Sequence, residues 1–135
     1  MIVVDASVLA AALADDGPDG DMARRRLRSE ELAAPSLVDL EVASVLRRAA
    51  HGGRMNDRRA RQALADLAEI PLQRAQHEPL LGRIWQLREN LTVYDAAYVA
   101  LSEALTALLL TADARLARAA GPTCEIEVLG GAPGG

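Results

Sequence analysis

The chain opens with Met1-Ile2-Val3-Val4-Asp5, an unbroken apolar run that stops at an acidic residue. A second run of this kind, Ala107-Leu108-Leu109-Leu110, is followed closely by Asp113. Short apolar runs without polar alternation are typical of strands covered on both faces, as in a parallel sheet. The two runs therefore predict central strands. If these strands are parallel, their carboxyl ends bring Asp5 and Asp113 to the same edge of the sheet.

Helical patterns alternate with short strands along the rest of the chain. We expect helices at 7–14, 21–30, from Ser36 to about 50, 57–68, 77–89, 92–105 and 114–120, and strands at 1–4, 32–34, 70–72, 107–110 and 126–129. This alternation predicts an α/β fold with a small, mainly parallel sheet between two helical layers. The domain is expected to span residues 1–129, and the glycine-rich residues 130–135 are expected to form a flexible tail.

Composition excludes several classes of protein. The 135 residues carry a net charge of −4, and all fifteen basic residues are arginines, which argues against nucleic-acid binding through bulk positive charge. Trp85, Tyr94 and Tyr98 are the only aromatic residues, too few for a stacking platform. The single Cys124 excludes an intrachain disulfide and fits a reducing cytoplasm, and no signal peptide or membrane span is recognisable.

Four acidic residues stand where helices meet strands or the core, and each also has a structural interpretation. Asp5 and Asp113 follow strands but suit N-caps of the helices after them. Asp95 lies three residues after Thr92, which is the spacing of a capping box. Ser36 and Asp39 show the same spacing, which accounts for Asp39.

Glu41 is harder to explain structurally. It borders a helical stripe of core residues, where a charge costs several kcal/mol unless it is paired or binds a metal. The stripe consists of Val38, Val42, Val45 and Ala49. The alternative is a salt bridge between Glu41 and Arg48, on the neighbouring row of the same helix.

A cluster of these four acids would need a cation. At a spacing of ~6 Å and an effective dielectric of ~20, each carboxylate pair would repel by ~3 kcal/mol. Such a cluster takes up protons or binds a cation, and the chain has no lysine to supply one. Mg²⁺ or Mn²⁺ suits a set of oxygen ligands, so metal-assisted phosphodiester chemistry is the leading hypothesis.

The motifs around these acids resemble those of PIN domains, and more narrowly those of the VapC toxins of bacterial toxin–antitoxin pairs. The matching stretches are Met1-Ile2-Val3-Val4-Asp5-Ala6-Ser7-Val8-Leu9, Leu40-Glu41-Val42-Ala43-Ser44-Val45-Leu46-Arg47-Arg48, Thr92-Val93-Tyr94-Asp95-Ala96-Ala97-Tyr98-Val99-Ala100-Leu101-Ser102-Glu103 and Leu110-Thr111-Ala112-Asp113-Ala114-Arg115-Leu116. They cover nearly the whole chain in order.

The resemblance implies a five-stranded parallel sheet between helices and a Mg²⁺- or Mn²⁺-dependent endoribonuclease. The family's acidic quartet falls on Asp5, Glu41, Asp95 and Asp113, as catalytic residues and metal ligands, with no departure in the four positions. Ser7 and Thr111 match polar positions that support the site. A homodimer and a cognate VapB-like antitoxin that occupies the acidic pocket are also implied.

Other interpretations stay open at this point. The arginines, Arg47 and Arg48 among them, either form a solvated helix face or grip phosphates around the acid pocket. Glu103 lies two helical turns beyond Asp95, too far for direct ligation. The alternatives to a toxin are a solitary PIN nuclease acting in RNA processing or on DNA, and a non-catalytic module whose acids dock an arginine-bearing peptide. A phosphoacceptor receiver domain would need a lysine, which the chain lacks.

Overall fold

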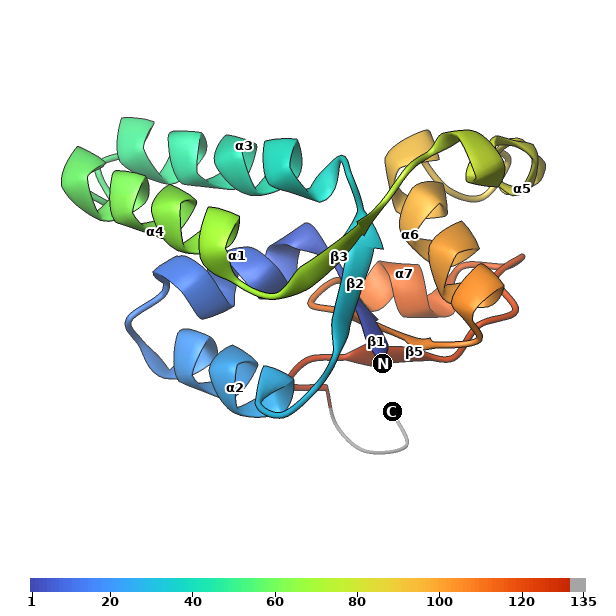
Figure 1. Ribbon diagram of the computed structural model, residues 1–135, viewed down its shortest axis with the longest axis horizontal. Coiled ribbons are helices and arrows are strands. Elements are labelled where there is room, and N and C mark those ends of the chain that lie inside the picture. Colours follow the sequence, from blue (N-terminus) through green and yellow to red (C-terminus); the bar gives the residue numbers. More distant parts are fainter. Residues whose placement is uncertain (132–135) are drawn as a thin grey trace.

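Five short strands form one parallel sheet in the order β3-β2-β1-β4-β5 (Figure 1). The computed structural model describes residues 1–131. The strands are β1 (Ile2–Val4), β2 (Leu32–Pro35), β3 (Leu72–Ala75), β4 (Leu108–Thr111) and β5 (Ile126–Val128). All four pairings between neighbouring strands are parallel. The predicted α/β fold with a small parallel sheet is therefore confirmed.

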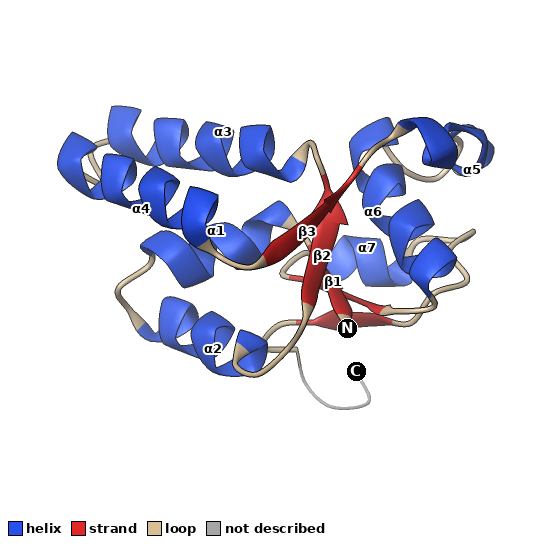
Figure 2. Ribbon diagram, viewed as in Figure 1, coloured by secondary structure: helices blue, strands red, loops and turns tan. Residues whose placement is uncertain are grey.

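Helices lie on both sides of the sheet (Figure 2). They are α1 (Ala6–Ala14), α2 (Pro18–Leu27), α3 (Val38–His51), α4 (Asp57–Glu69), the 3₁₀ turn η1 (Glu78–Leu80), α5 (Leu81–Gln86), α6 (Val93–Leu105) and α7 (Ala114–Arg118). Helix α1 packs against β4 and against α2, α3 and α4, whereas α6 packs against β1, β2 and β4 and against α5. The sheet is thus the middle layer of three.

The two strands expected at the centre of the sheet are almost fully buried. Val3 and Val4 of β1 and Leu109 and Leu110 of β4 have no exposed surface. Aliphatic side chains from both faces of these strands enter the core, which explains why their sequences show no polar alternation. Phenylalanine is absent from the chain, so leucine, valine and alanine supply nearly all of the buried side chains.

The order of the strands creates a switch point at the centre of the sheet. The chain proceeds from β1 to β2 and β3 in one direction, and β4 then returns to the other side of β1. In β1 and β4 the paired residues run from Ile2 with Leu108 to Val4 with Leu110. The carboxyl ends of the two strands therefore meet at the position where parallel α/β sheets bind ligands.

The capping box predicted at Ser36 and Asp39 is wrong. Helix α3 begins at Val38 after Leu37, without a side-chain cap. The Ser36 hydroxyl donates instead to the Ala75 carbonyl of β3, at 3.0 Å. Asp39 accepts three hydrogen bonds from two nitrogens of the Arg74 guanidinium of β3. Both side chains therefore connect α3 to the sheet edge, a long-range pairing that local spacing does not reveal.

Several predicted element boundaries also shift at prolines. The helix expected at 21–30 begins at Pro18, because proline suits the first turn of a helix, and it ends at Leu27. The strand expected at 70–72 begins after Pro71 and runs to Ala75. The helix expected at 77–89 is split into η1, which contains Pro79, and the short α5.

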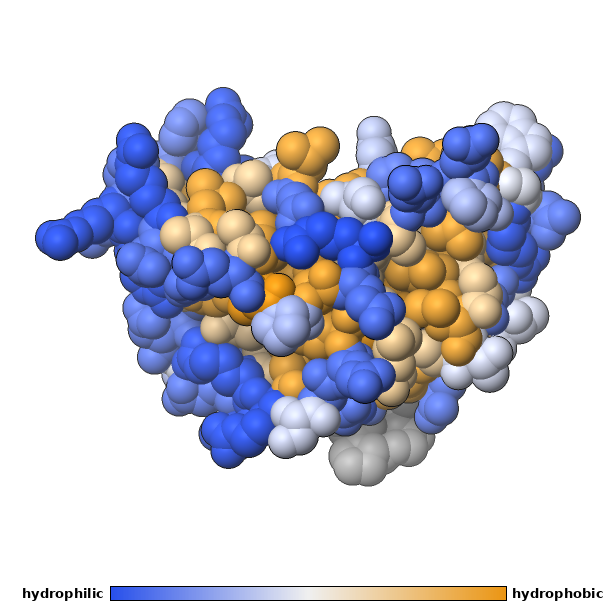
Figure 3. All heavy atoms as spheres, in the orientation of Figure 1, coloured by the Kyte–Doolittle hydropathy of each residue, from blue (hydrophilic) through white to orange (hydrophobic). Residues whose placement is uncertain are grey.

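The face of the molecule shown in Figure 3 carries both hydrophilic and hydrophobic residues. Hydrophilic side chains gather over the outer end of α3 and α4, and apolar residues show along the middle of the face (Figure 3). Within residues 1–131, no helix is both long and apolar enough to cross a membrane. Of the predicted flexible tail, Gly130 and Gly131 follow β5 in a turn, whereas 132–135 lie outside the described residues.

Candidate active site

Asp5 is buried at the carboxyl end of β1 and accepts four hydrogen bonds. Its Oδ1 accepts from the backbone N–H groups of Ser7 and Val8, at 3.1 and 3.2 Å, and so caps α1. The Ser7 hydroxyl donates to the same oxygen at 2.5 Å, and the Thr111 hydroxyl donates to Oδ2. Asp5 is only 9% exposed, and burial raises its pKa although the hydrogen bonds act in the opposite direction. The N-cap role predicted for Asp5 is confirmed, and within residues 1–131 its buried carboxyl group has hydrogen-bond donors but no cation partner.

Ser7 and Thr111 join the ends of β1 and β4 through this carboxyl group. The Ser7 Oγ accepts from the Ala112 N–H at 3.1 Å, and the Thr111 Oγ1 accepts from the Asp113 N–H at 3.0 Å. Each hydroxyl thus donates to Asp5 and accepts from the loop after β4. The two residues predicted as supporting polar groups fix the position of Asp5 relative to Asp113.

Glu41 faces the same site from the first turn of α3. The Tyr98 hydroxyl, on α6, donates to its Oε1 at 2.6 Å. Burial raises the pKa of Glu41, and the nearby charges of Asp95 and Asp5 raise it further. The alternative salt bridge with Arg48 is not formed, because the Arg48 guanidinium donates to Ser44 at 3.0 Å instead.

Asp95 lies in the first turn of α6, as its spacing from Thr92 predicted. The Thr92 hydroxyl caps the helix by accepting from the Asp95 N–H at 3.1 Å. Burial raises the pKa of the Asp95 side chain, with further contributions from the charges of Asp113 and Asp5. The Thr92 hydroxyl lowers the pKa of this carboxylate against the effect of burial, and the Asp95 side chain lines the same cavity as the other acids.

Asp113 differs from the other three acids. It caps α7 by accepting from the Arg115 N–H at 2.9 Å, and its carboxylate pairs with the Arg115 guanidinium at 3.3 Å. The arginine lowers the pKa of Asp113, and the Asp113 side chain is 37% exposed. Asp113 is thus a partly exposed member of the group, already paired with the Arg115 guanidinium.

The four acids line a single cavity of about 260 Å³, which opens to solvent between α1, α3, α6 and the end of β4. Its polar wall is completed by Ser7, Ser44, Arg48 and Tyr98. Arg47 is not part of this wall. A neighbouring groove of about 630 Å³ lies between α1, α3 and α4 and shares Ser7 and Val45 with the acidic cavity.

The donor set fits a divalent cation that keeps part of its water shell. No arginine or histidine nitrogen in residues 1–131 comes within 4.0 Å of the carboxylates of Asp5, Glu41 or Asp95. The same part of the chain holds no three acidic, histidine or cysteine side chains close enough together to enclose an ion directly. Mg²⁺ is commonly bound by one or two carboxylates and several waters, which this spacing allows.

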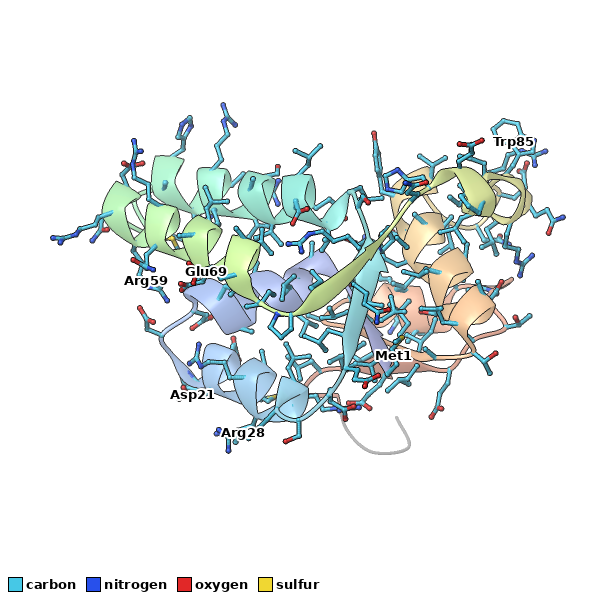
Figure 4. All side chains as sticks on the ribbon, in the orientation of Figure 1. Met1, Asp21, Arg28, Arg59, Glu69 and Trp85 are labelled. Atoms are coloured by element: carbon cyan, nitrogen blue, oxygen red, sulfur yellow. The ribbon has the colours of Figure 1, made fainter. Side chains whose placement is uncertain are left out.

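Tyr98 was not predicted as a site residue, although a signal for it existed. It lies three residues after Asp95 on α6, so the two side chains share a face of the helix. Of the other two aromatic residues, Trp85 is 63% exposed and projects from α5 at the opposite end of the molecule from Arg59 (Figure 4). Glu103, as expected, lies outside the cavity, where Arg83 binds it at 2.6 Å.

Comparison with known proteins shows the family of the chain. Residues 2–122 match the PIN domain family. The chain belongs to the PIN domain family. It is 45% identical over 129 residues to ribonuclease VapC9 of Mycobacterium tuberculosis, covering 96% of this chain and 98% of that protein. It is 44% identical over 128 residues to ribonuclease VapC1 of the same species, covering 94% and 96%. The sequence resemblance to VapC proteins is therefore confirmed.

Two solved structures share the fold of this PIN domain. PAE2754 from Pyrobaculum aerophilum superposes with a TM-score of 0.67 at 26% identity, covering 94% of this chain and 83% of that one. VapBC2 from Rickettsia felis, solved bound to a DNA fragment from its promoter, superposes with a TM-score of 0.68 at 16% identity, covering 95% and 98%. The second likeness concerns the fold alone.

Proposed function

We propose that this PIN domain is a Mg²⁺- or Mn²⁺-dependent endoribonuclease and the toxin of a VapBC-type pair. The observation that carries the proposal is the group of three carboxylates, Asp5, Glu41 and Asp95, which lie together without a cation partner. Proteins that share more than two-fifths of this sequence over nearly its full length are named ribonucleases. RNA is therefore the substrate class that we assign to the cavity.

The side chains would have distinct roles in this reaction. Asp5, Glu41 and Asp95 would hold the ion partly through its water molecules, because no three acids of residues 1–131 lie close enough together to enclose it directly. Asp113 would complete the set directly or through water. When bound, the ion would act as a Lewis acid and lower the pKa of a water molecule bound to it. Asp5 contributes most to preorganisation, because four hydrogen bonds fix its carboxyl group before substrate arrives.

Arg48 is our candidate for contact with the RNA backbone. It is exposed on the cavity wall and forms no ion pair among residues 1–131, whereas eight other arginines do. Arg47 is exposed next to it and would contribute less.

Charge reversal tests this assignment. Binding of RNA to a cleavage-deficient Asp5→Asn background should weaken in Arg48→Glu, and the slope of log affinity against log salt should fall by about one. Arg47→Glu should show a smaller change, and Arg58→Glu, an exposed arginine on α4, serves as the matched control. Unchanged affinity and slope in both Arg47→Glu and Arg48→Glu would contradict the phosphate-binding role.

A cognate antitoxin and a second copy of the chain are the partners that we propose. An antitoxin segment lying in the groove between α1, α3 and α4 would reach the acids, because that groove shares Ser7 and Val45 with the acidic cavity. A basic side chain of the antitoxin would neutralise part of the negative charge of the carboxylates in the cavity. A toxin of this kind would act on RNA in the cytoplasm, as a homodimer.

The direct test is cleavage of total cellular RNA by the purified chain, freed of any bound partner, in Mn²⁺ or in excess chelator. Discrete fragments should form only with metal and should be absent with Asp5→Asn and Asp95→Asn. Asp19→Asn, an exposed acid on α2, is the control and should cleave normally. Cleavage of DNA in place of RNA would favour the nuclease alternative. A folded chain with neither cleavage nor metal binding would contradict the enzyme.

A further inference from the structure

Tyr98 is a buried tyrosine whose hydroxyl is committed to one of the four acids. The residue is 2% exposed, and its ring enters the core from α6. Its hydroxyl donates to the Oε1 of Glu41 at 2.6 Å, across a separation of 57 residues in the sequence. A phenol has one proton to donate, so this hydrogen bond uses its whole capacity as a donor.

Glu41 depends on this contact for its orientation. No other hydrogen bond to its carboxylate is formed within residues 1–131, and no cation lies within 4.0 Å of it. Asp5, by contrast, is fixed by four hydrogen bonds. A glutamate side chain has three rotatable bonds, and the Tyr98 hydroxyl is what selects among the rotamers at this site. Oε1 is engaged, and Oε2 is left for another partner.

The position of Tyr98 also couples two elements of the site. Asp95 stands three residues earlier on α6, so one helix carries an acid of the cavity and the group that orients a second acid on α3. A shift of α6 would therefore move Asp95 and Glu41 together.

We propose that Tyr98 is a positioning residue, which holds the Glu41 carboxylate in the orientation that a divalent ion requires. This inference rests on the proposed function, since it concerns the metal site of the same cavity. Groups that orient metal ligands typically change metal affinity by about 10–100-fold when they are removed. Loss of the hydroxyl alone should weaken metal binding by releasing the Glu41 side chain, without unfolding the protein.

The test is a double-mutant cycle on Mn²⁺ binding by the full chain, titrated calorimetrically to millimolar metal. Tyr98→Phe keeps the buried ring and should raise the Mn²⁺ dissociation constant by about tenfold. In a Glu41→Ala background the same change should have no further effect, because the group through which Tyr98 acts is gone. Tyr94→Phe, which removes a hydroxyl from an exposed tyrosine of the same helix, should bind like the wild type.

The outcomes separate this inference from the proposed function. Two results would overturn the positioning role while leaving the metal site in place. One is a wild-type Mn²⁺ affinity in Tyr98→Phe. The other is a loss of Mn²⁺ affinity on adding Tyr98→Phe to Glu41→Ala that equals the loss in the wild-type background. Absence of Mn²⁺ binding by the wild-type chain would overturn the proposed function and this inference with it. The unfolding free energy of each variant in urea identifies any variant that fails to fold.

Discussion

Asp5 and Asp113 occupy equivalent positions in the fold and yet differ in nearly every electrostatic property. Both follow central strands that pair in parallel, and both cap the helix that comes next. Asp5 is buried without a cation, and its pKa is raised. Asp113 is partly exposed, is paired with Arg115, and has a lowered pKa. The end of a parallel strand thus determines where each acid lies, whereas burial of Asp5 and the arginine beside Asp113 shift the two pKa values in opposite directions.

The two acids also differ in their distance from the paired strands, because Val4 pairs with Leu110 and Asp5 is therefore level with Thr111. Asp5 follows the last residue of β1 directly, and α1 begins at Ala6. After β4, the exposed Ala112 separates Thr111 from Asp113, so the second acid lies farther from the core. The helix capped by Asp5 has nine residues and packs against three other helices, whereas α7 has only five residues.

The comparison predicts unequal effects on cleavage when each acid is neutralised. Asp5→Asn should lower the rate of RNA cleavage by about a thousandfold, as expected for the loss of a preorganised charged group. Asp113→Asn should cost only about tenfold, as expected for a group acting at the periphery of a metal site. Single-turnover rates in saturating Mn²⁺ measure both. Equal losses would show that burial does not distinguish their contributions.

Removing the Thr111 hydroxyl, which connects the two acids, should destabilise the protein. Thr111→Val deletes the hydroxyl that donates to Asp5 and accepts from the Asp113 N–H. Because Asp5 then loses a buried donor, the unfolding free energy in chelator should fall by about 1–3 kcal/mol. Ser7→Ala, at an exposed position, should cost less. Urea titrations compare the two, and a smaller loss in Thr111→Val than in Ser7→Ala would be inconsistent with the buried contact.

The two acids should affect the pH dependence of stability with opposite signs. Asp5 has a raised pKa, so the folded state binds its proton more tightly than the unfolded state does. Its contribution therefore becomes less favourable as pH rises above the ordinary value of 3.8. The pKa of Asp113 is lowered, so its contribution is present above 3.8 and is lost as pH falls.

Urea unfolding of metal-free variants measures these contributions, above about pH 4 for Asp5 and from about pH 4 downward for Asp113. The stability of Asp5→Asn relative to the wild type should increase with pH, and that of Asp113→Asn should decrease. The same sign for both variants would contradict the environments described for the two acids.

Much of this site was predictable from the sequence, because strand ends and helix turns are local features. The apolar runs before Asp5 and Asp113, and the cap at Thr92, place three acids without knowledge of the fold. Contacts that depend on long-range packing were missed: the hydrogen bond from Tyr98 to Glu41, and the pairing of Asp39 with Arg74 that replaced the expected capping box. The difference in burial between Asp5 and Asp113 could not be predicted either, because the local sequence around the two acids is similar.

The most direct test of this account is the Mn²⁺ dissociation constant of the wild-type chain, Asp5→Asn, Asp113→Asn and the control Asp19→Asn, measured by calorimetry. We predict that the wild type and Asp19→Asn bind alike, that Asp113→Asn binds about tenfold more weakly, and that Asp5→Asn shows no binding. Binding of Mn²⁺ to Asp5→Asn with wild-type affinity would contradict the central claim, namely that the buried carboxyl group of Asp5 anchors a metal site.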